Sequence, residues 1–189
     1  MVLRSHLLAG MTIGPWASSE LTLAEPLWAK VPDRCLTILD RGFLSYSLLH
    51  GLYAGGVQRH WLIRAKANLK WQTLKRLGPH DHLVEITVPR QAHRAHPELP
   101  ETMQVRAIGY QRRGFRPVRL VTSLLDPEAF PRKEIIELYH ERWHIETFFR
   151  ELQEDLDFEH WHTRTLHGLW VELLFSMIYV TVVRAHMAE

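Results

Sequence analysis

Three side chains that suit phosphate chemistry recur within eight residues of the chain. Tyr139, Arg142 and Glu146 bring together a phenol, a guanidinium and a carboxylate. On an ideal helix each residue advances by about 100°, so the three, together with Gln153, fall along one stripe about 60° wide. A carboxylate can hold a divalent metal, and a guanidinium can bind phosphate oxygens through two parallel hydrogen bonds. The spacing therefore predicts a helix edge suited to a metal-bound phosphate.

The element that must carry this edge is a long helical pattern over residues 133–157. Its apolar positions form an adjacent stripe that would seat the helix on a sheet, comprising Leu138, Ile145, Phe149, Leu152 and Leu156. A second helical pattern covers residues 166–187. Its most apolar run, residues 168–183, has about 16 residues and includes Glu172, fewer than the roughly 20 that a bilayer core requires. We therefore expect a buried helix and no membrane span.

Upstream, the pattern indicates an α/β core. Residues 35–39 form a short, almost continuous apolar run that ends at Asp40, which is typical of a strand buried on both faces of a sheet. Residues 5–14 and 60–64 are further strand candidates, and helices are expected after Ser18–Ser19 and over residues 45–54. Residues 83–88, 103–110 and 118–123 are β-like. The three prolines within residues 89–101 argue against a helix or a central strand there.

Composition sets broad limits. The chain has 189 residues, 46% of them hydrophobic, which is enough for a real core. Its single cysteine, Cys35, excludes a disulfide scaffold and fits the reducing cytoplasm. The termini show no secretory signal peptide, because the first ten residues contain too short an apolar run.

Charge is unevenly distributed, although the formal net charge is only +2. Two stretches, residues 41–80 and 102–125, contain no Asp or Glu but twelve Lys and Arg residues, interleaved with Trp61, Trp71, Tyr110 and Phe115. Residues 126–159 carry acids throughout. Basic segments with aromatic residues suit a polyanion such as nucleic acid. The alternative is a solvated surface whose charges pair with the acidic helix.

At these residues the chain resembles a known family. LYHERWHIETFFREL at residues 138–152, after Thr122-Ser123-Leu124, is similar to the glutamate helix of bacterial DDE transposases. The subgroup is the insertion-sequence-four family, whose signature is Tyr-x2-Arg-x3-Glu-x6-Lys. LTILDRGFLSYSLL at residues 36–49 resembles the segment with the family's second aspartate, which maps to Asp40. The final lysine of the signature is Gln153 here.

The resemblance implies a fold, a reaction and a cofactor. The fold is an RNase H-like α/β core with a β-strand insertion between the second aspartate and the glutamate. We expect residues 1–65 to hold the partial core, residues 66–121 the β-rich insertion, and residues 122–189 the C-terminal helices. The reaction is cut-and-paste DNA transposition, which needs two divalent metals, Mg²⁺ or Mn²⁺, held by carboxylates. Asp40 and Glu146 would be ligands, converging although 106 positions apart.

The same resemblance assigns the DNA contacts and the partners. Tyr139 and Arg142 would contact phosphate near the scissile bond, with Gln153 at the lysine position and basic support from Arg41, Lys66 and Lys70. DNA, as transposon ends and target, is the expected partner. A homodimer, or a heterodimer with an intact transposase, would complete the assembly.

One carboxylate has no counterpart. The family's first aspartate lies on the first core strand, yet residues 1–19 contain no Asp or Glu, and Glu20 lies past the strand. We therefore expect an N-terminally truncated copy that does not cleave or join DNA alone, or a DNA-binding or transposase-inhibiting remnant.

A zinc site is a further alternative. His140-Glu141-Arg142-Trp143-His144 matches H-E-x-x-H, in which two histidines one turn apart bind zinc and the glutamate acts as base. On an unbroken helix these histidines would face away from the Tyr139–Arg142–Glu146 stripe. A third ligand would have to come from Glu159, His160 or His162.

Overall fold

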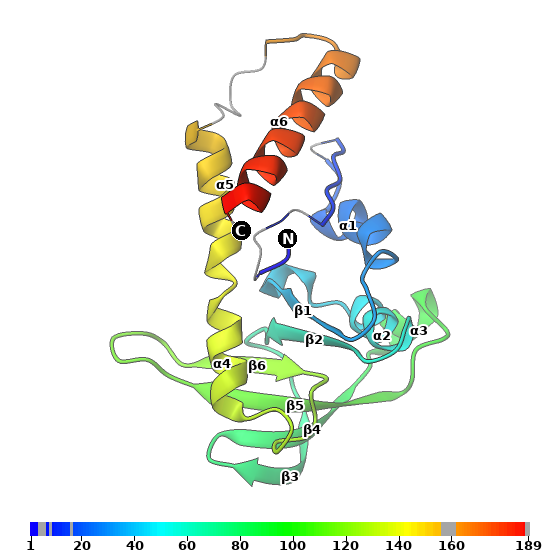
Figure 1. The fold of residues 1–189 in the computed structure, drawn as a ribbon. Helices are drawn as coiled ribbons and strands as arrows, with labels where there is room; N and C mark the ends of the chain where they lie inside the picture. Colours follow the sequence, from blue (N-terminus) through cyan, green and yellow to red (C-terminus); the bar gives the residue numbers. More distant parts are fainter. Residues whose placement is uncertain (4–6, 8, 16, 156–161, 188–189) are drawn as a thin grey trace. The chain divides into compact units, whose positions relative to one another are not determined.

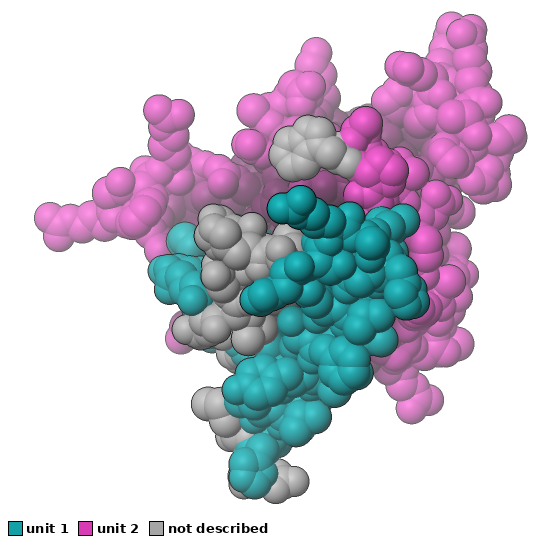
Figure 2. Space-filling model, turned by 90° about the horizontal axis from the view of Figure 1, so that it is seen from above, with its two compact units in different colours: residues 1–11, 140–189 teal, residues 12–139 magenta. Residues whose placement is uncertain are grey.

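The computed structural model describes all residues except 4–6, 8, 16, 156–161 and 188–189 (Figure 1). The chain divides into two compact units, coloured separately in Figure 2. Unit 1 comprises residues 1–11 and 140–189, and unit 2 comprises residues 12–139.

Unit 2 is built on a six-stranded mixed sheet in the order β1-β2-β6-β5-β4-β3. Its strands are β1 (Cys35–Leu39), β2 (Arg59–Arg64), β3 (Gln72–Gly78), β4 (Asp81–Thr87), β5 (Thr102–Tyr110) and β6 (Val118–Thr122). β1 and β2 pair in parallel, with Leu36 opposite His60, and the other neighbours pair antiparallel. The helix α2 (Tyr46–Ala54) forms the crossover between β1 and β2.

Apolar side chains cover both faces of this sheet. On one face Leu49 and Leu52 of α2 belong to a buried cluster with Trp61 and Ile63 of β2. On the opposite face Ile135 of α4 (Arg132–His140) belongs to a second cluster, which includes Leu62, Leu120 and Tyr139. The consecutive residues Trp61, Leu62 and Ile63 of β2 thus point to alternate faces and are all buried, as expected of a strand between two layers.

Most of the predicted elements of unit 2 are confirmed. α1 (Glu20–Trp28) begins after Ser19, whose hydroxyl accepts a hydrogen bond from the Thr22 amide, as the serine cap predicted. The strands expected near residues 35–39, 60–64, 83–88, 103–110 and 118–123 are present, as is the helix near residues 45–54. The predicted burial of residues 35–39 on both faces is wrong, because β1 is an edge strand in which only Leu39 is buried.

Three further local predictions are wrong. The described residues of the 5–14 segment form neither helix nor strand. The helix α3 (Arg90–Ala95) begins directly after Pro89, because a proline at the N-cap forfeits no hydrogen bond of the helix. β3 was not expected, since it is an edge strand whose residues 72–76 are exposed and include Lys75 and Arg76. Charged residues on an edge strand prevent pairing with strands of other molecules. They also remove the alternation of apolar and polar residues by which a strand is predicted from the sequence.

Unit 1 contains the helices α5 (Trp143–Asp155) and α6 (Leu166–Met187). The Arg184 guanidinium of α6 lies 4.9 Å from the Phe148 ring centroid of α5. The predicted burial of α6 is wrong, because within it Leu173 and Met177 are buried while Leu174, Phe175 and other large apolar side chains are exposed. The helix is apolar on all sides, so one neighbour cannot cover it. By length and composition α6 could also cross a membrane, a test that core helices of soluble proteins pass too.

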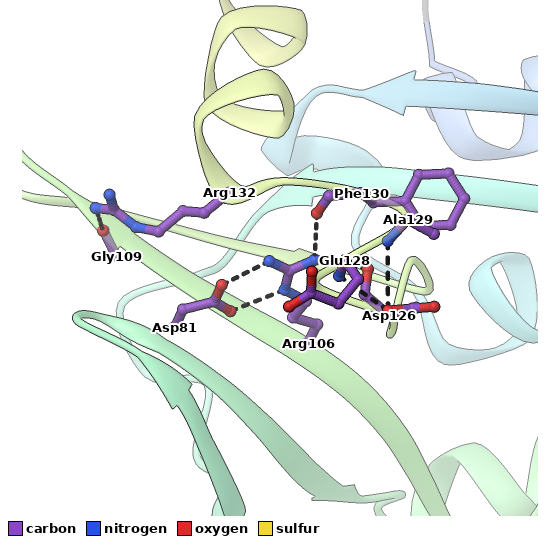
Figure 3. Close-up of polar contacts among 8 residues, drawn as sticks. All are labelled: Asp81, Arg106, Gly109, Asp126, Glu128, Ala129, Phe130 and Arg132. Carbon is purple, nitrogen blue, oxygen red and sulfur yellow. Dashed lines mark hydrogen bonds and ion pairs between the residues drawn. The ribbon is translucent and has the colours of Figure 1, made fainter.

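A buried ion pair ties the outer strands of the sheet to the chain that leads into α4 (Figure 3). The Arg106 guanidinium of β5 is fully buried and donates to both carboxylate oxygens of Asp81 in β4, at 2.8 and 2.5 Å. Its remaining terminal nitrogen donates to the backbone carbonyls of Phe130 and Asp126, at 2.7 and 3.3 Å. One side chain therefore joins β4, β5 and the loop between β6 and α4.

Replacing one partner of this pair should be costly. We expect Asp81→Ala to lower the free energy of unfolding by about 3–5 kcal/mol, because it leaves the Arg106 charge buried without its counter-ion. Glu137→Ala breaks the exposed Lys133–Glu137 pair, 3.8 Å apart, and should cost about 1 kcal/mol or less. Urea unfolding followed by circular dichroism compares the two variants. Equal losses would contradict the structural importance of Arg106.

Candidate functional site

Asp40 stands where the carboxyl end of β1 meets the following turn. Its side chain is exposed and accepts a hydrogen bond of 3.3 Å from the Gly42 amide, which caps the short 3₁₀ helix Arg41–Phe43. Ligands of α/β sheets bind beyond the carboxyl ends of parallel strands, and β1 is parallel to β2. The carboxylate is thus placed where a ligand could reach it.

Three basic side chains expected to support DNA binding lie in the same unit. Arg41, Lys66 and Lys70 are exposed, as a phosphate contact requires. The Lys66 ammonium donates to the Leu44 carbonyl at 3.3 Å, so this lysine joins the chain after β2 to the turn after Asp40. Arg41 and Lys66 therefore flank the segment that presents the carboxylate.

Arg142 and Glu146 are brought together by the structure, as the spacing predicted. An Arg142 terminal nitrogen lies 2.8 Å from a Glu146 carboxylate oxygen, and the two side chains are 23% and 42% exposed. Glu146 lies in the first turn of α5, where the helix dipole favours a negative charge. Gln153 is exposed on the same helix. Glu146 belongs to unit 1 and Asp40 to unit 2, so their convergence stays a prediction.

Tyr139 lies in a different environment from the exposed edge that the helical stripe implied. It is 7% exposed, and its cluster comprises Leu62, Ile108, Leu120 and Ile135. Most of the Tyr139 side chain is therefore core. Its contact with phosphate, which would involve the hydroxyl, stays a prediction.

The continuous helix expected over residues 133–157 is interrupted. α4 ends at His140, Glu141 and Arg142 form a turn, and α5 begins at Trp143. Across the break the amides of His144 and Ile145 donate to carbonyls three residues earlier, at 3.0 Å each. The prediction that Tyr139 and Glu146 share one stripe assumed an unbroken helix with about 100° between successive residues. The turn between α4 and α5 removes that assumption, so the predicted angle between these two residues does not hold.

The same break removes the basis of the zinc alternative. H-E-x-x-H sites need both histidines on one helical face, whereas His140 ends α4 and His144 belongs to α5. Glu141 pairs with the His144 imidazole at 2.9 Å. Among the described residues no three His, Cys, Asp or Glu side chains gather as a metal site. Glu159 and His160, two of the suggested third ligands, lie outside that part of the chain, whereas His162 lies within it.

The aromatic residues of the basic segments divide between core and surface. Trp61 is 1% exposed, so its suggested part in nucleic-acid binding is wrong. Phe115 is 70% exposed in the loop between β5 and β6, beside the exposed residues Arg113 and Arg116. Trp71 lies beneath the Arg119 guanidinium, 4.6 Å from the ring centroid. The basic surface thus retains aromatic side chains at two places.

Sequence reasoning missed a partly buried serine–histidine contact between β2 and the end of β6. The Ser123 hydroxyl accepts from the Trp61 amide at 3.1 Å and lies 3.2 Å from His60 Nδ1, to which it can donate its own proton. Burial lowers the pKa of His60, and the contact with Ser123 opposes this shift. No spacing signal links positions 60 and 123, because strand pairing alone brings them together.

Comparisons with known proteins decide the family. A model of the "Transposase DDE domain" matches residues 1–181. The chain belongs to the DDE transposases of the insertion-sequence-four family. It is 35% identical over 156 residues to "Transposase InsG for insertion sequence element IS4" of Escherichia coli K12, covering 82% of this chain and 35% of that protein. "Putative transposase InsZ" of the same strain is 39% identical over 69 residues, covering 36% and 23% respectively.

Membership is consistent with the fold, because the mixed α/β architecture is that of an RNase H-like DDE transposase. The matched region includes Asp40 and the whole Tyr139–Gln153 segment. The chain spans about a third of the length of InsG and about a quarter of the length of InsZ.

The low pKa of His60 gives a prediction for stability. Burial lowers the pKa of this imidazole in the folded protein, so it binds a proton at a lower pH than in the unfolded chain, where the pKa is about 6.5. The free energy of unfolding should therefore fall as the pH drops from about 6.5 through the lower folded pKa. His60→Asn keeps an acceptor near Ser123 but has no group that titrates in this range. Its free energy of unfolding should therefore decrease less between pH 7.5 and 5.5 than that of the unmodified chain. Urea unfolding at both pH values measures this difference, with the exposed His167→Asn as the control. A decrease for His60→Asn as large as that of the unmodified chain would contradict the prediction.

Proposed function

We propose that this chain supplies part of the catalytic domain of a transposase that cleaves DNA strands and joins them by a divalent-metal reaction. The support is the family match over residues 1–181, a range that includes Asp40, Glu146 and the Tyr139–Gln153 segment. Asp40 and Glu146 each contribute a metal ligand. DNA, as element ends and target, is the substrate, and the reducing cytoplasm is its setting.

The two carboxylates fit a hard divalent cation. Mg²⁺ and Mn²⁺ prefer oxygen ligands, and Mg²⁺ keeps several waters, so few protein ligands suffice. Asp40 is exposed beyond β1, and the Glu146 side chain is 42% exposed. When bound, such metals activate water or a 3′-hydroxyl and stabilise the leaving oxygen.

The remaining residues bind and orient the DNA backbone. Arg142, already fixed beside Glu146, presents a planar guanidinium that can bind two oxygens of one phosphate. Arg41 follows Asp40 directly, and Lys66 bonds to the turn after it, so both add exposed positive charge near the carboxylate. Lys70 adds a further exposed cation in the same unit. The Tyr139 hydroxyl would donate from the edge of the core. Such contacts fix the register of the strand relative to the carboxylates.

The third carboxylate is not provided by residues 1–19, which contain neither Asp nor Glu. We therefore expect the 189 residues by themselves to bind metal weakly and not to cleave DNA. An assembly with an intact transposase would supply the missing ligand.

Binding of Mn²⁺ tests the ligand assignment. Asp40→Asn and Glu146→Gln should each weaken Mn²⁺ binding by at least about tenfold, a loss seen even for outer-shell residues of metal sites. Asp126→Asn and Glu137→Gln serve as controls. Neither carboxylate is a proposed metal ligand, so these substitutions should leave Mn²⁺ binding unchanged. Electron paramagnetic resonance of free Mn²⁺ measures the affinity. If Asp40→Asn binds like the unmodified chain, the shared site is refuted.

Nicking of supercoiled plasmid DNA in Mg²⁺ or Mn²⁺ tests the expected inactivity. No nicking above the buffer control is expected from the 189-residue chain. Metal-dependent nicking that Asp40→Ala abolishes would show that the two carboxylates suffice, and would overturn that part of the proposal.

Gln153 gives a separate prediction for DNA binding. Gln153→Lys restores the cation of the family signature on an exposed position of α5. If that position contacts phosphate, the variant should bind DNA more tightly at low salt, and the slope of log K against log salt should steepen by about 0.9. Fluorescence anisotropy with labelled duplex DNA measures the slope. Glu154→Gln, which also raises the net charge by one at the neighbouring exposed position, is the control, and an equal change in both variants would indicate a non-specific charge effect.

A further inference from the structure

A second place in unit 2 has the chemistry of a ligand site. A pocket of about 650 Å³ opens where the β3–β4 hairpin ends and β5 passes into β6. Its thirteen lining residues come from β3 to β6, the segments beside these strands and the beginning of α4, and they include Trp71, His80, His82, Arg119 and Arg132. Asp40 and Glu146 are not among them, so this pocket is distinct from the proposed carboxylate site.

The electrostatics of the pocket favour an anion. Two of the lining residues are arginines and two are histidines, and none is Asp or Glu. Asp81, the acid that directly follows His80, is buried and bonded to Arg106, so its charge is already balanced. Two fixed positive charges without a lining carboxylate produce a field that attracts a negatively charged group.

Arg119 is held in a fixed position within this lining. One terminal nitrogen of its guanidinium donates to the carbonyls of Lys66 and Ala67, at 3.3 and 2.8 Å. The guanidinium also lies over the Trp71 ring at 4.6 Å, a cation–π contact. Those hydrogen bonds use only one nitrogen, so the guanidinium keeps donors for an incoming anion. A cation fixed in advance loses little entropy when it binds.

Arg132 and His82 also have hydrogen-bonding capacity left. A terminal nitrogen of Arg132 donates to the Gly109 carbonyl at 2.6 Å (Figure 3). Within the described part of the chain, Arg132 Nε and His82 Nδ1 are buried atoms without a hydrogen-bond partner. Such atoms are uncommon in folded proteins, and they concentrate where a ligand or water completes the network. Two of them belong to residues of one pocket that lacks acidic residues.

The β3–β4 hairpin is attached firmly enough to shape the pocket. The Gly109 amide of β5 donates to the His80 carbonyl at 2.7 Å. Gly109 therefore joins the hairpin through its amide and Arg132 through its carbonyl. The side chains that line the pocket near Gly109 therefore project from backbone held by hydrogen bonds.

We propose that this pocket binds a phosphate group, with Arg119 as the main ligand and Arg132 and the histidines as supporting donors. A guanidinium matches phosphate geometry through two parallel hydrogen bonds. The phosphate could be free in solution or part of a DNA strand. Phosphate binding here does not depend on the proposed catalytic function, although a DNA strand as its carrier would agree with that function.

The test is a nuclear magnetic resonance titration of the ¹⁵N-labelled chain with inorganic phosphate at constant ionic strength, with chloride as the reference. The Trp71 indole and the Gly109 amide should shift saturably with phosphate and not with chloride. Arg119→Gln should weaken the affinity by about tenfold, as expected for the loss of a charge-assisted pair. Arg94→Gln removes an exposed arginine of α3 outside the pocket and should leave the affinity unchanged.

Arg132→Gln is the second variant, since Arg119 also joins backbone segments and its loss could disturb folding. Non-saturating shifts in the unmodified chain, or an affinity that neither pocket variant lowers, would overturn the proposal. The dinucleotide dTpdT, titrated in parallel, separates the sources. Tighter binding of dTpdT than of inorganic phosphate supports a DNA strand, whereas binding of inorganic phosphate alone supports a site for free phosphate.

Discussion

The arrangement of unit 2 depends on one buried cation. The Arg106 guanidinium has no access to solvent, so each of its donors must find an acceptor inside the protein. Asp81 supplies two acceptors, and the carbonyls of Phe130 and Asp126 supply the others. Because those acceptors come from β4 and from the loop before α4, burying this one charge requires the strand and the loop to be in place together. The outer strands and the helix with the Tyr139 side chain are therefore coupled.

This coupling bears on how an insertion can be joined to a catalytic core. β3 to β6 are the strands expected as an insertion, yet β6 pairs directly with β2 and extends the sheet that begins at β1. The strands expected as an insertion therefore belong to the same sheet as the strands expected as the core. Strand pairing from β1 through β2 and β6 to β5 connects the strand that ends before Asp40 to the strands that line the proposed phosphate pocket.

Sequence patterns predicted those parts of the fold where one local rule dominates. The Cys35–Leu39 strand was predicted because a short continuous apolar run is typical of a β-strand. The helix α1 was predicted because Ser19 can cap its first turn. The patterns failed where context overrides the local rule. α3 follows a proline, β3 is a charged edge, and the helical stripe at residues 133–157 takes no account of a turn at Glu141 and Arg142. Arg142 and Glu146, four residues apart, could be predicted as neighbours, whereas Ser123 and His60 could not.

In the proposed site, Arg142 and a metal ion would compete for the Glu146 carboxylate. With the two groups 2.8 Å apart, the Glu146 carboxylate already has a cation beside it. A divalent metal bound to the same carboxylate would repel the guanidinium, since like charges at such distances interact by about 4 kcal/mol even at an effective dielectric of 20. Metal binding would thus release Arg142 from Glu146 for an anion. A phosphate beside the metal is the group that satisfies both charges, so the same pair that balances the unliganded helix would favour metal and DNA binding together.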